Sequence, residues 1–308
     1  MSTPHFLAIA DVPAEQIVRL LDRAVELKRT RRSPAQPLRG RSLVQIFEKP
    51  SLRTRLSFDI AMAELGGHSS YLSPAEVGLG RRESVADVAR VVARMVDAVV
   101  LRTYSHETVE EFARHSAIPV VNGLSDLEHP CQALADVLTV RERKGLRGVR
   151  AAYVGDGNNV AHSFMLCAAK AGLSLRVASP SGYEPQPRFI ELAQSAARTS
   201  GAKIEIGNDP LAAVEGADVV YTDVWTSMGQ EAEYERRRRA FAGFQVNAAL
   251  LARAKPDAIV MHDLPAHRGE EVTDDVIDGP QSAVFEQAEN RLHAQKAVLC
   301  WLLGETPS

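Results

Sequence analysis

The sequence predicts an α/β protein of two domains, in which each domain is a mostly parallel sheet flanked by helices. The length of 308 residues is comfortable for two domains of ordinary size. Short apolar runs alternate with segments of helical periodicity, which is typical of a parallel sheet. The alternation pauses around Gly145 and Gly148 and then begins again. We therefore expect a first domain over residues 1–145, completed by a C-terminal helix over 286–308, and a second domain over 146–285.

The composition excludes several classes of protein. A hydrophobic fraction of 45% and a charged fraction of 24% indicate a substantial core rather than a disordered or fibrous chain. The net charge of −3 provides no positive field for nucleic acid or an anionic membrane. The sequence shows no signal peptide and no long apolar span, and its three cysteines are widely spaced without a Cys-x-x-Cys pair. We expect a cytoplasmic protein with no nucleic-acid or membrane partner and no metal site.

An amphipathic helix is expected to open the first domain. Apolar residues recur at helical spacing between Asp11 and Lys28, with Asp11 placed to cap the helix and Pro13 in its first turn. The apolar runs that follow predict strands over 43–47, 98–101 and 120–121. Helical periodicity predicts helices over 54–65, 85–95, 108–115 and 132–144.

The same alternation builds the second domain. Apolar runs predict strands over 151–154, 174–178, 203–206, 218–221 and 258–261. Helices are expected over 160–171, 189–197 and 248–254, and the last helical segment, 286–303, is expected to pack back on the first domain. The run Glu235–Arg239 contains four consecutive arginines. Because consecutive residues of a helix face several directions, we expect a solvated face there rather than an anion site.

Residues 47–55 run from a predicted strand into the start of a helix and carry the groups of an anion cradle. Backbone N–H groups at a helix N-terminus are unpaired, Ser51 and Thr54 add hydroxyl donors, and Arg53 and Arg55 add charged ones. A phosphate suits all of these groups. The alternative is that Ser51 caps the helix while both arginines make surface salt bridges, and the local pattern leaves both interpretations open.

The run Ser51–Arg55 resembles the carbamoyl-phosphate loop of the aspartate and ornithine carbamoyltransferases. Further motifs of that family follow in the same order, and they are Arg102 with His106, His129-Pro130-Cys131-Gln132, Gly155–Asn159, Asp223–Glu231, His262-Asp263-Leu264-Pro265 and Glu289-Asn290-Arg291. Motifs in register over nearly the whole chain are far more specific than one loop. The chain is therefore identified as a member of this family, and Ser227-Met228-Gly229 points to its ornithine branch.

The resemblance implies a carbamoyl-phosphate domain, an amino-acid domain and two helices that cross between them. It also implies a homotrimer, or a multiple of trimers, with active sites at subunit boundaries. The implied reaction moves the carbamoyl group of carbamoyl phosphate to the δ-amine of L-ornithine, giving citrulline and phosphate, toward arginine. No cofactor is expected.

The resemblance also implies the site residues. The carbamoyl-phosphate site is expected to contain Ser51, Leu52, Arg53, Thr54, Arg55, Arg102, His129, Gln132, Leu264 and Arg291. Ornithine is expected to meet Asn159, Asp223, Ser227 and Met228, and the expected catalytic residues are Arg102, His129, Asp223 and Asp263. By the same analogy, the Leu264–Pro265 peptide bond is cis.

Bland alternatives stand beside some of these roles. A histidine before Pro130, such as His129, could be a core residue at the start of a helix. Asp156 could simply form the glycine turn in which it lies. A dinucleotide site is disfavoured, because the spacing Gly-x-Gly-x-x-Gly would need glycine where the chain has Val160.

Two positions depart from the family pattern. Asp263 stands where ornithine carbamoyltransferases normally have cysteine. Its charge could attract a cationic side chain, or raise the amine's pKa and suppress attack. Gly78 stands where many relatives lend a glutamine or histidine to the neighbouring subunit, a contact that Arg81 or Arg82 would make instead. The alternatives are a carbamoyltransferase for lysine or putrescine and a non-catalytic sensor of carbamoyl phosphate or ornithine.

Overall fold

The computed structural model describes residues 3–31, 36–227 and 229–304, and the chain divides into two compact units. Unit 1 comprises Met1–Ala135 with Asn290–Ser308, and unit 2 comprises Asp136–Glu289. The divisions fall inside α6 (Pro130–Lys144) and α13 (Val284–Leu303), so both helices contribute residues to both units. This confirms the two predicted crossing helices. The predicted boundary at 145 lies at the end of α6, where the apolar pattern changes.

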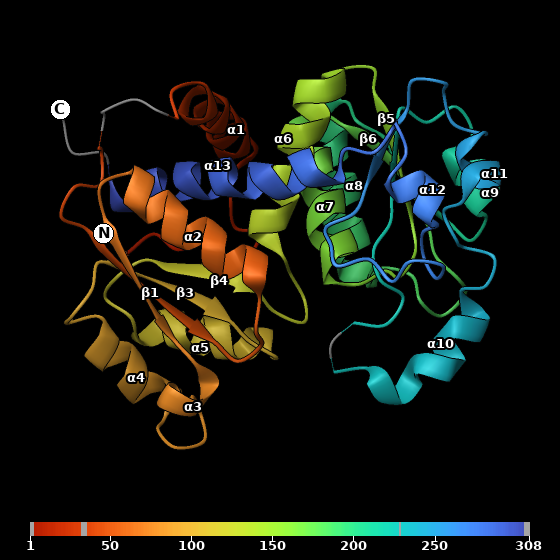
Figure 1. Cartoon of the computed structure of the whole chain (residues 1–308). Coiled ribbons are helices and arrows are strands. Elements are labelled where there is room, and N and C mark those ends of the chain that lie inside the picture. The colour runs from red at the N-terminus through yellow and green to blue at the C-terminus, as the bar shows by residue number, and fades with distance from the viewer. Residues whose placement is uncertain (1–2, 32–35, 228, 305–308) are drawn as a thin grey trace. The chain divides into compact units, whose positions relative to one another are not determined.

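Within its described residues, unit 1 contains a parallel sheet with the strand order β2-β1-β3-β4. The strands are β1 (Ser42–Phe47), β2 (His68–Leu72), β3 (Ala98–Arg102) and β4 (Val120–Leu124). The helices are α1 (Ala14–Arg29), α2 (Leu52–Glu64), α3 (Pro74–Val77), α4 (Val85–Val92) and α5 (His106–His115). Figure 1 shows α2 over one face of this sheet and α4 and α5 over the other. The loops after β1 and β3 therefore diverge, and ligands of parallel sheets bind at such a point.

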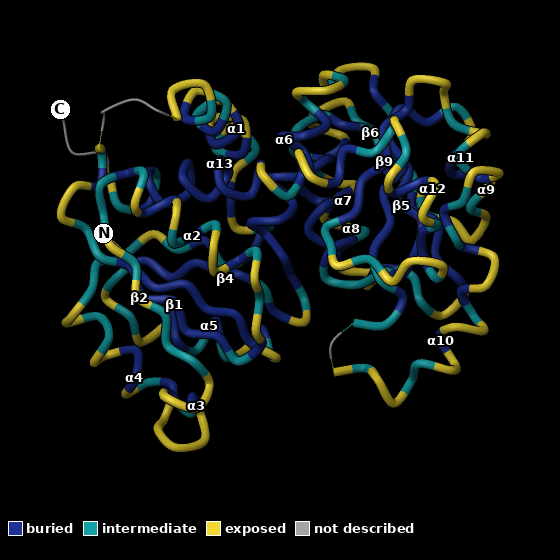
Figure 2. Tube along the Cα trace, in the orientation of Figure 1, coloured by how far each residue is buried: buried dark blue, intermediate teal, exposed yellow. Residues whose placement is uncertain are grey.

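Strands β1, β3 and β4 of unit 1 are mostly dark blue in Figure 2, because they are buried on both faces, whereas the edge strand β2 is partly exposed. Val44 and Ile46 of β1 pack with Val88 of α4 and Phe112 of α5 in one apolar cluster. Polar Gln45 is also fully buried, and its amide donates to Asp59 of α2 at 2.7 Å. Alternate β1 residues thus contact the helices on opposite faces of the sheet. These contacts fix the strand end that leads to Ser51.

Two local predictions for unit 1 differ from the structure. Helix α1 begins at Ala14 with Pro13, not Asp11, at its N-cap, and no side chain caps it. The carbonyl of Pro13 accepts from the N–H groups of Gln16 and Ile17, so the rigid proline sets the helix start. Strand β2 was not predicted, because His-Ser-Ser-Tyr-Leu is a polar edge strand without an apolar run.

Within its described residues, unit 2 contains a second parallel sheet, with the order β7-β6-β5-β8-β9. The strands are β5 (Arg150–Val154), β6 (Ser174–Ala178), β7 (Ile204–Gly207), β8 (Val219–Tyr221) and β9 (Ile259–Met261). The helices are α7 (Asn159–Ala171), α8 (Pro187–Ser200), α9 (Pro210–Val214), α10 (Tyr234–Ala240), α11 (Ala248–Leu251) and α12 (Asp274–Ile277), with a 3-10 turn at Glu231–Glu233. The strand order reverses between β5 and β8, so this unit has its own switch point.

The arginine run of α10 is not uniformly solvated. Arg236 and Arg238 are exposed, but Arg237 is buried and donates to Asp156 Oδ2 at 2.8 Å and to the carbonyl of Trp225 at 3.0 Å. The expectation of a solvated face is therefore wrong at Arg237. The reason is tertiary, because a buried carboxylate from a distant turn supplies its counter-charge.

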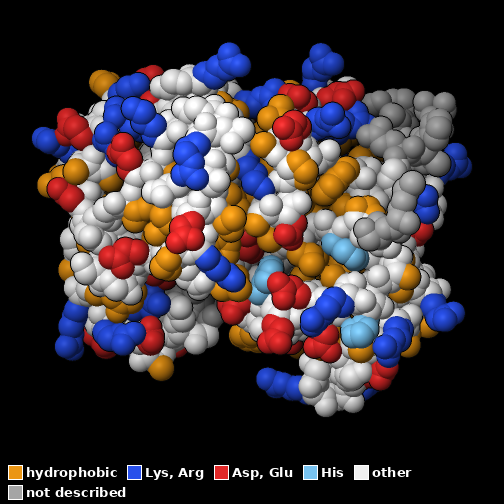
Figure 3. Space-filling model, turned by 180° about the vertical axis from the view of Figure 1, so that it is seen from behind, with side chains coloured by type: hydrophobic (Ala, Val, Ile, Leu, Met, Phe, Trp, Pro, Cys, Tyr) orange, Lys and Arg blue, Asp and Glu red, His pale blue; other side chains and the backbone are white. Residues whose placement is uncertain are grey.

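The surface agrees with the small net charge. Figure 3 shows positive and negative side chains interspersed over the visible face. Among the residues that the structure describes, no helix combines the length and the apolar character that crossing a bilayer requires.

Candidate active site

The N-terminus of α2 forms the base of a half-site in unit 1. Ser51 caps the helix, because its Oγ accepts from the N–H of Thr54 at 3.2 Å. The Ser51 hydroxyl also donates to Thr54 Oγ1 at 3.0 Å. The capping interpretation is thus correct, and it is compatible with an anion cradle, since the cap holds two hydroxyls at the N-terminus of the helix, whose dipole favours an anion.

Basic side chains from distant parts of the chain surround this helix end and His129. Arg291 of α13 donates to Thr54 Oγ1 at 2.6 Å, and Arg102 ends β3. Burial of His129, followed by the charges of Arg291, Arg102 and Arg53, holds the pKa of this imidazole well below its usual 6.5. His129 is therefore neutral at neutral pH. The group as a whole brings together residues as far apart in the sequence as Ser51 and Arg291, which are separated by 240 positions.

The structure does not bring Arg55 into this group. The Arg55 guanidinium lies 4.1 Å from the ring centroid of Tyr71, and its Nε is 3.8 Å from Asp59. Gln132 is fully buried in the first turn of α6, whereas Leu52 is exposed. Beside Gln132, burial raises the pKa of the Cys131 thiol to about 12, so this cysteine is a packing residue without nucleophilic character at neutral pH.

A second half-site forms at the switch point of unit 2, around Asp223. Asn158 caps α7 through its Oδ1, which accepts from the N–H groups of Val160 and Ala161, and its Nδ2 donates to Asp223 Oδ2 at 2.7 Å. The other Asp223 oxygen accepts from the N–H of Val224 at 2.7 Å. Asp223 is therefore fixed by two donors and only 5% exposed. Sequence reasoning missed Asn158, although asparagine before a helix is a capping signal.

The glycine turn before α7 serves packing. A Cβ atom added to Gly157 would lie 2.1 Å from the backbone nitrogen of Pro185, so only glycine fits this close approach. Asp156 in the same turn forms the buried pair with Arg237, and burial outweighs that charge to raise the pKa of Asp156 to about 6. Asp156 therefore anchors α10 to this turn.

The loop after β9 adds a second carboxylate beside Asp223. Asp223, Asp263 and His262 each place one ligand atom within 4.8 Å of the others. Both ring nitrogens of His262 have hydrogen-bond partners, because Nδ1 accepts from the Leu264 N–H and Nε2 lies 3.0 Å from Glu271. The two carboxylates are thus the groups that favour a cation here, and an alkylammonium group fits them. The group of His267, Glu270 and Glu271 has ligand atoms at similar spacing.

The remaining predicted residues lie on neighbouring loops of unit 2. The Leu264–Pro265 peptide bond is cis, as expected, and Leu264 has the positive φ of 60°. Asn159 is half-buried at the start of α7, and the N–H of Ser227 donates to Gln230 Oε1 at 3.1 Å. The prediction for Met228 falls outside the described residues.

Comparisons with known proteins match both units. A family model for the carbamoyl-phosphate-binding domain of aspartate/ornithine carbamoyltransferases matches residues 4–142, and the model for the Asp/Orn-binding domain matches residues 147–302. The ornithine carbamoyltransferase of Anoxybacillus flavithermus is 56% identical over 97% of this chain and 96% of its own length. The anabolic ornithine carbamoyltransferase of Pyrococcus furiosus is 54% identical over 97% of this chain and 96% of its own.

Solved structures agree with these matches. The structure of ornithine carbamoyltransferase from Pyrococcus furiosus superposes with a TM-score of 0.96 at 53% identity, covering 99% of each chain. The anabolic enzyme of Campylobacter jejuni superposes with a TM-score of 0.93 at 42% identity, covering 98% of this chain and 99% of its own. Motif order, fold and overall similarity therefore agree, and the chain belongs to the aspartate/ornithine carbamoyltransferase family.

Proposed function

We propose that this protein transfers the carbamoyl group of carbamoyl phosphate to the δ-amine of L-ornithine, forming L-citrulline and phosphate. The observation that carries this proposal is that unit 1 contains a cationic half-site and unit 2 an anionic one, each at the switch point of its own parallel sheet. Relatives that are 52–56% identical carry the name ornithine carbamoyltransferase, and one of them is called anabolic. We propose the same biosynthetic direction, toward arginine, in the cytoplasm.

In the first half-site, the helix N-terminus and its basic neighbours bind the phosphate. Ser51, Leu52, Arg53 and Thr54 would supply donors from the start of α2, and Arg291 already donates to Thr54. Arg55 would join only by leaving the ring of Tyr71. The guanidinium groups of Arg53 and Arg291 would stabilise the negative charge that develops on phosphate as it leaves.

The carbamoyl end of the substrate would meet Arg102, His129 and Gln132. As the amine attacks the carbonyl carbon, the carbonyl oxygen becomes negative, and preorganised donors stabilise it. The depressed pKa of His129 means that it acts there as a neutral hydrogen-bonding group. Arg102 supplies the full positive charge, and Gln132 would accept from the carbamoyl amide. The C–O bond to phosphate then breaks, and the proton lost by the attacking nitrogen leaves with the phosphate.

In the second half-site, Asp223 binds and orients the amine. It is held by Asn158 and by the backbone of Val224, so its position is set before the substrate arrives. Asn159, Ser227 and Met228 would recognise the α-amino and α-carboxylate groups. The Leu264 carbonyl would meet the carbamoyl group.

Asp263 supports a second candidate acceptor. Because its carboxylate lies within 4.8 Å of that of Asp223, the half-site holds two carboxylates where a relative with cysteine holds one. A longer or doubly cationic amine, such as lysine or putrescine, would also be attracted. Retention of Ser227 disfavours putrescine, which has no carboxylate for that loop to recognise.

We also propose that the protein is a homotrimer or a multiple of trimers. One face of α2 exposes three large apolar side chains at spacing i, i+4, i+8, namely Leu52 at 75%, Leu56 at 54% and Ile60 at 36%. An apolar stripe on a solvent-exposed helix face indicates a protein interface. Leu56→Asp should shift the molecular mass measured by light scattering toward the monomer, whereas Leu192→Asp on α8 should not. An unchanged mass for Leu56→Asp would contradict this interface.

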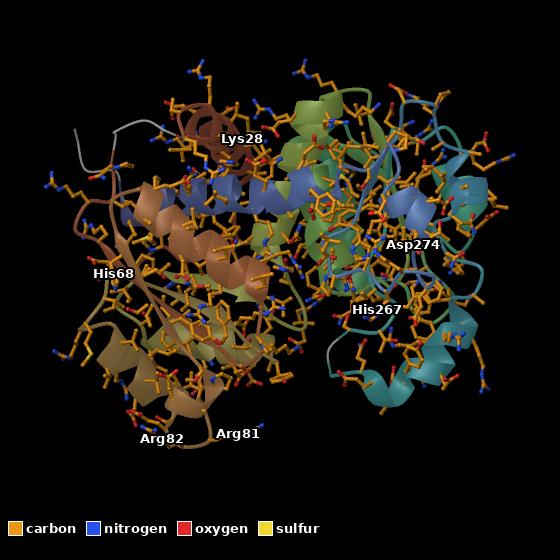
Figure 4. The ribbon with its side chains drawn as sticks, viewed as in Figure 1. Lys28, His68, Arg81, Arg82, His267 and Asp274 are labelled. Carbon is orange, nitrogen blue, oxygen red and sulfur yellow. The ribbon has the colours of Figure 1, made fainter. Side chains whose placement is uncertain are left out.

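Arg81 and Arg82 are proposed to reach the phosphate of a neighbouring subunit. Both are exposed on the loop between α3 and α4, as Figure 4 shows. Gly78 has the left-handed φ of 59°, and a Cβ there would lie 2.8 Å from Arg82 Cβ, so this loop has no room for a side chain at position 78. Wild-type phosphate affinity in both Arg81→Ala and Arg82→Ala would count against this role.

The deciding experiment is citrulline formation from carbamoyl phosphate and ornithine across pH 6 to 10, with lysine and putrescine in parallel. Turnover with ornithine supports the proposal. Turnover only with another amine would show that this amine, and not ornithine, is the acceptor, and would make Asp263 a specificity residue. Binding of carbamoyl phosphate without any turnover would instead indicate a sensor.

A further inference from the structure

A buried pair of side chains holds the loop that follows β9. The side chains of His262 and Glu271 are both 0% exposed. His262 Nδ1 accepts from the N–H of Leu264 at 2.9 Å, and His262 Nε2 lies 3.0 Å from Glu271 Oε1. The same Glu271 oxygen accepts from the N–H of His267 at 2.6 Å. The pair thus ties residues 262–267 at two points, with Leu264 and Pro265 between them.

These contacts determine the tautomer of His262. A backbone N–H can only donate, so His262 Nδ1 must be the unprotonated nitrogen. The proton of the neutral ring is then on Nε2, where it donates to the Glu271 carboxylate. Without the Glu271 carboxylate, the Leu264 N–H alone would favour Nε2–H, whereas Asp263 Oδ1, 3.6 Å from Nδ1, would favour a proton on Nδ1 that opposes the Leu264 N–H. Glu271 therefore acts on Leu264 through the ring of His262.

The backbone at Leu264 needs such support. Its φ of 60° lies in the left-handed region, which a branched side chain seldom adopts and which persists only where neighbouring contacts enforce it. A third contact comes from α13, because the N–H of His262 donates to Gln287 Oε1 at 2.9 Å. Gln287 in turn donates to the buried Asp136 Oδ1 at 2.7 Å. Asp263 and Leu264 are thereby carried on a backbone held at three points.

We propose that Glu271 is a positioning residue for carbamoyl transfer, which sets the Leu264 backbone and the adjacent Asp263 carboxylate by holding His262 in its Nε2–H tautomer. This inference rests on the function proposed above, because it assigns the loop a place in that reaction. The hydrogen bonds of Glu271 run to the imidazole of His262 and to the backbone of His267, so it acts on Leu264 through the imidazole and not by contact with substrate.

The test compares Glu271→Ala with a conservative rescue and a matched control. Glu271→Gln retains an oxygen that accepts from both donors, so it should keep kcat for citrulline formation within a few-fold of wild type. Glu271→Ala should lower kcat about 100-fold, as expected for a displacement near 1 Å of reacting groups. Asp218→Ala is the control, since Asp218 is also buried, accepts from the Arg150 N–H at 2.9 Å and pairs with Lys255 at 2.6 Å, but precedes β8. It should lower the melting temperature and leave kcat unchanged.

A further variant keeps the test decisive if Glu271→Ala does not fold. In His262→Asn, the amide oxygen replaces Nδ1 as acceptor for Leu264, but the side chain is too short to reach Glu271. The proposal expects this amide to rotate without its partner, with the same loss of kcat. Wild-type kcat in Glu271→Ala or in His262→Asn would overturn the proposal. So would a loss of kcat in Asp218→Ala equal to that in Glu271→Ala, because the role would then be structural.

Amide hydrogen exchange separates this inference from the proposed function. Exchange at residues 262–267 should be faster in Glu271→Ala than in wild type and unchanged in Glu271→Gln. This readout does not require turnover. A wild-type protein without activity toward ornithine would contradict the proposed function, while unchanged exchange in Glu271→Ala would contradict the positioning role.

Discussion

The two half-sites use opposite electrostatics and different construction. The half-site of unit 1 is cationic, and it assembles a helix N-terminus with Arg102 and Arg291 from distant segments. The half-site of unit 2 is anionic, and its carboxylates Asp223 and Asp263 are carried by the loops after two neighbouring strands. In the proposed reaction, the cationic half would stabilise the charge that leaves with phosphate, whereas the anionic half would control the charge of the incoming amine.

The largest expected effect tests the cationic half. Arg102→Ala removes the charge beside His129 and should lower kcat by 10²- to 10³-fold, corresponding to about 3 kcal/mol of transition-state stabilisation. Steady-state citrulline formation measures this loss. Arg90→Ala is the control, because Arg90 pairs with Asp87 on the surface of α4 and should retain wild-type kcat. A comparable loss in both variants would contradict the assignment.

A smaller effect is expected in the anionic half. Asp263→Cys removes one of two carboxylates near the amine, so the pKa of the bound ammonium should fall and the kcat–pH profile should move to lower pH. The KM for ornithine should rise, since the cation loses an attractive charge. Asp263→Asn should shift the profile in the same direction. A profile that stays in place or moves to higher pH would show that Asp263 does not raise the amine's pKa.

The smallest effect concerns stability rather than turnover. Because the pKa of folded His129 is well below 6.5, the unfolded chain takes up a proton below pH 6.5 that the folded chain does not. The unfolding free energy should therefore fall by up to about 1.4 kcal/mol per pH unit as the pH decreases through this window, and this term should vanish above it. Urea denaturation between pH 5 and 7.5 measures the slope. His129→Asn should reduce the slope of unfolding free energy against pH. A slope equal to that of wild type would show that a group other than His129 has the depressed pKa.

Patterns along the chain predicted most of the fold and the strand ends at which the proposed site residues lie. Strand 174–178 was predicted with its observed bounds, Arg102 ends β3, and the motifs at 51–55, 129 and 223 follow the ends of β1, β4 and β8. These predictions succeeded because buried strands, helix caps and turns depend on residues close in sequence. Strand β2 was missed for the same reason, because a polar edge strand forms by pairing with β1 and its own residues carry no strand pattern.

Other features depended on partners that no local pattern reveals. Arg237 looked like part of a solvated run until the turn at Asp156 supplied its counter-charge, and Asn158 became a ligand of Asp223 only where β5 and β8 lie side by side. Glu271 had no motif of its own, yet it meets the ring of His262.

By itself, the sequence determined the two α/β domains, the family and the chemical character of both half-sites, because periodicity and motif order are properties of the chain. Tertiary structure alone decided which buried charges pair, that Arg55 stacks on Tyr71 rather than joining Arg291, and that Glu271 meets the ring of His262. The physical reason is that a buried charge or donor is stable only with a partner, and the partner's location depends on how the strands are ordered.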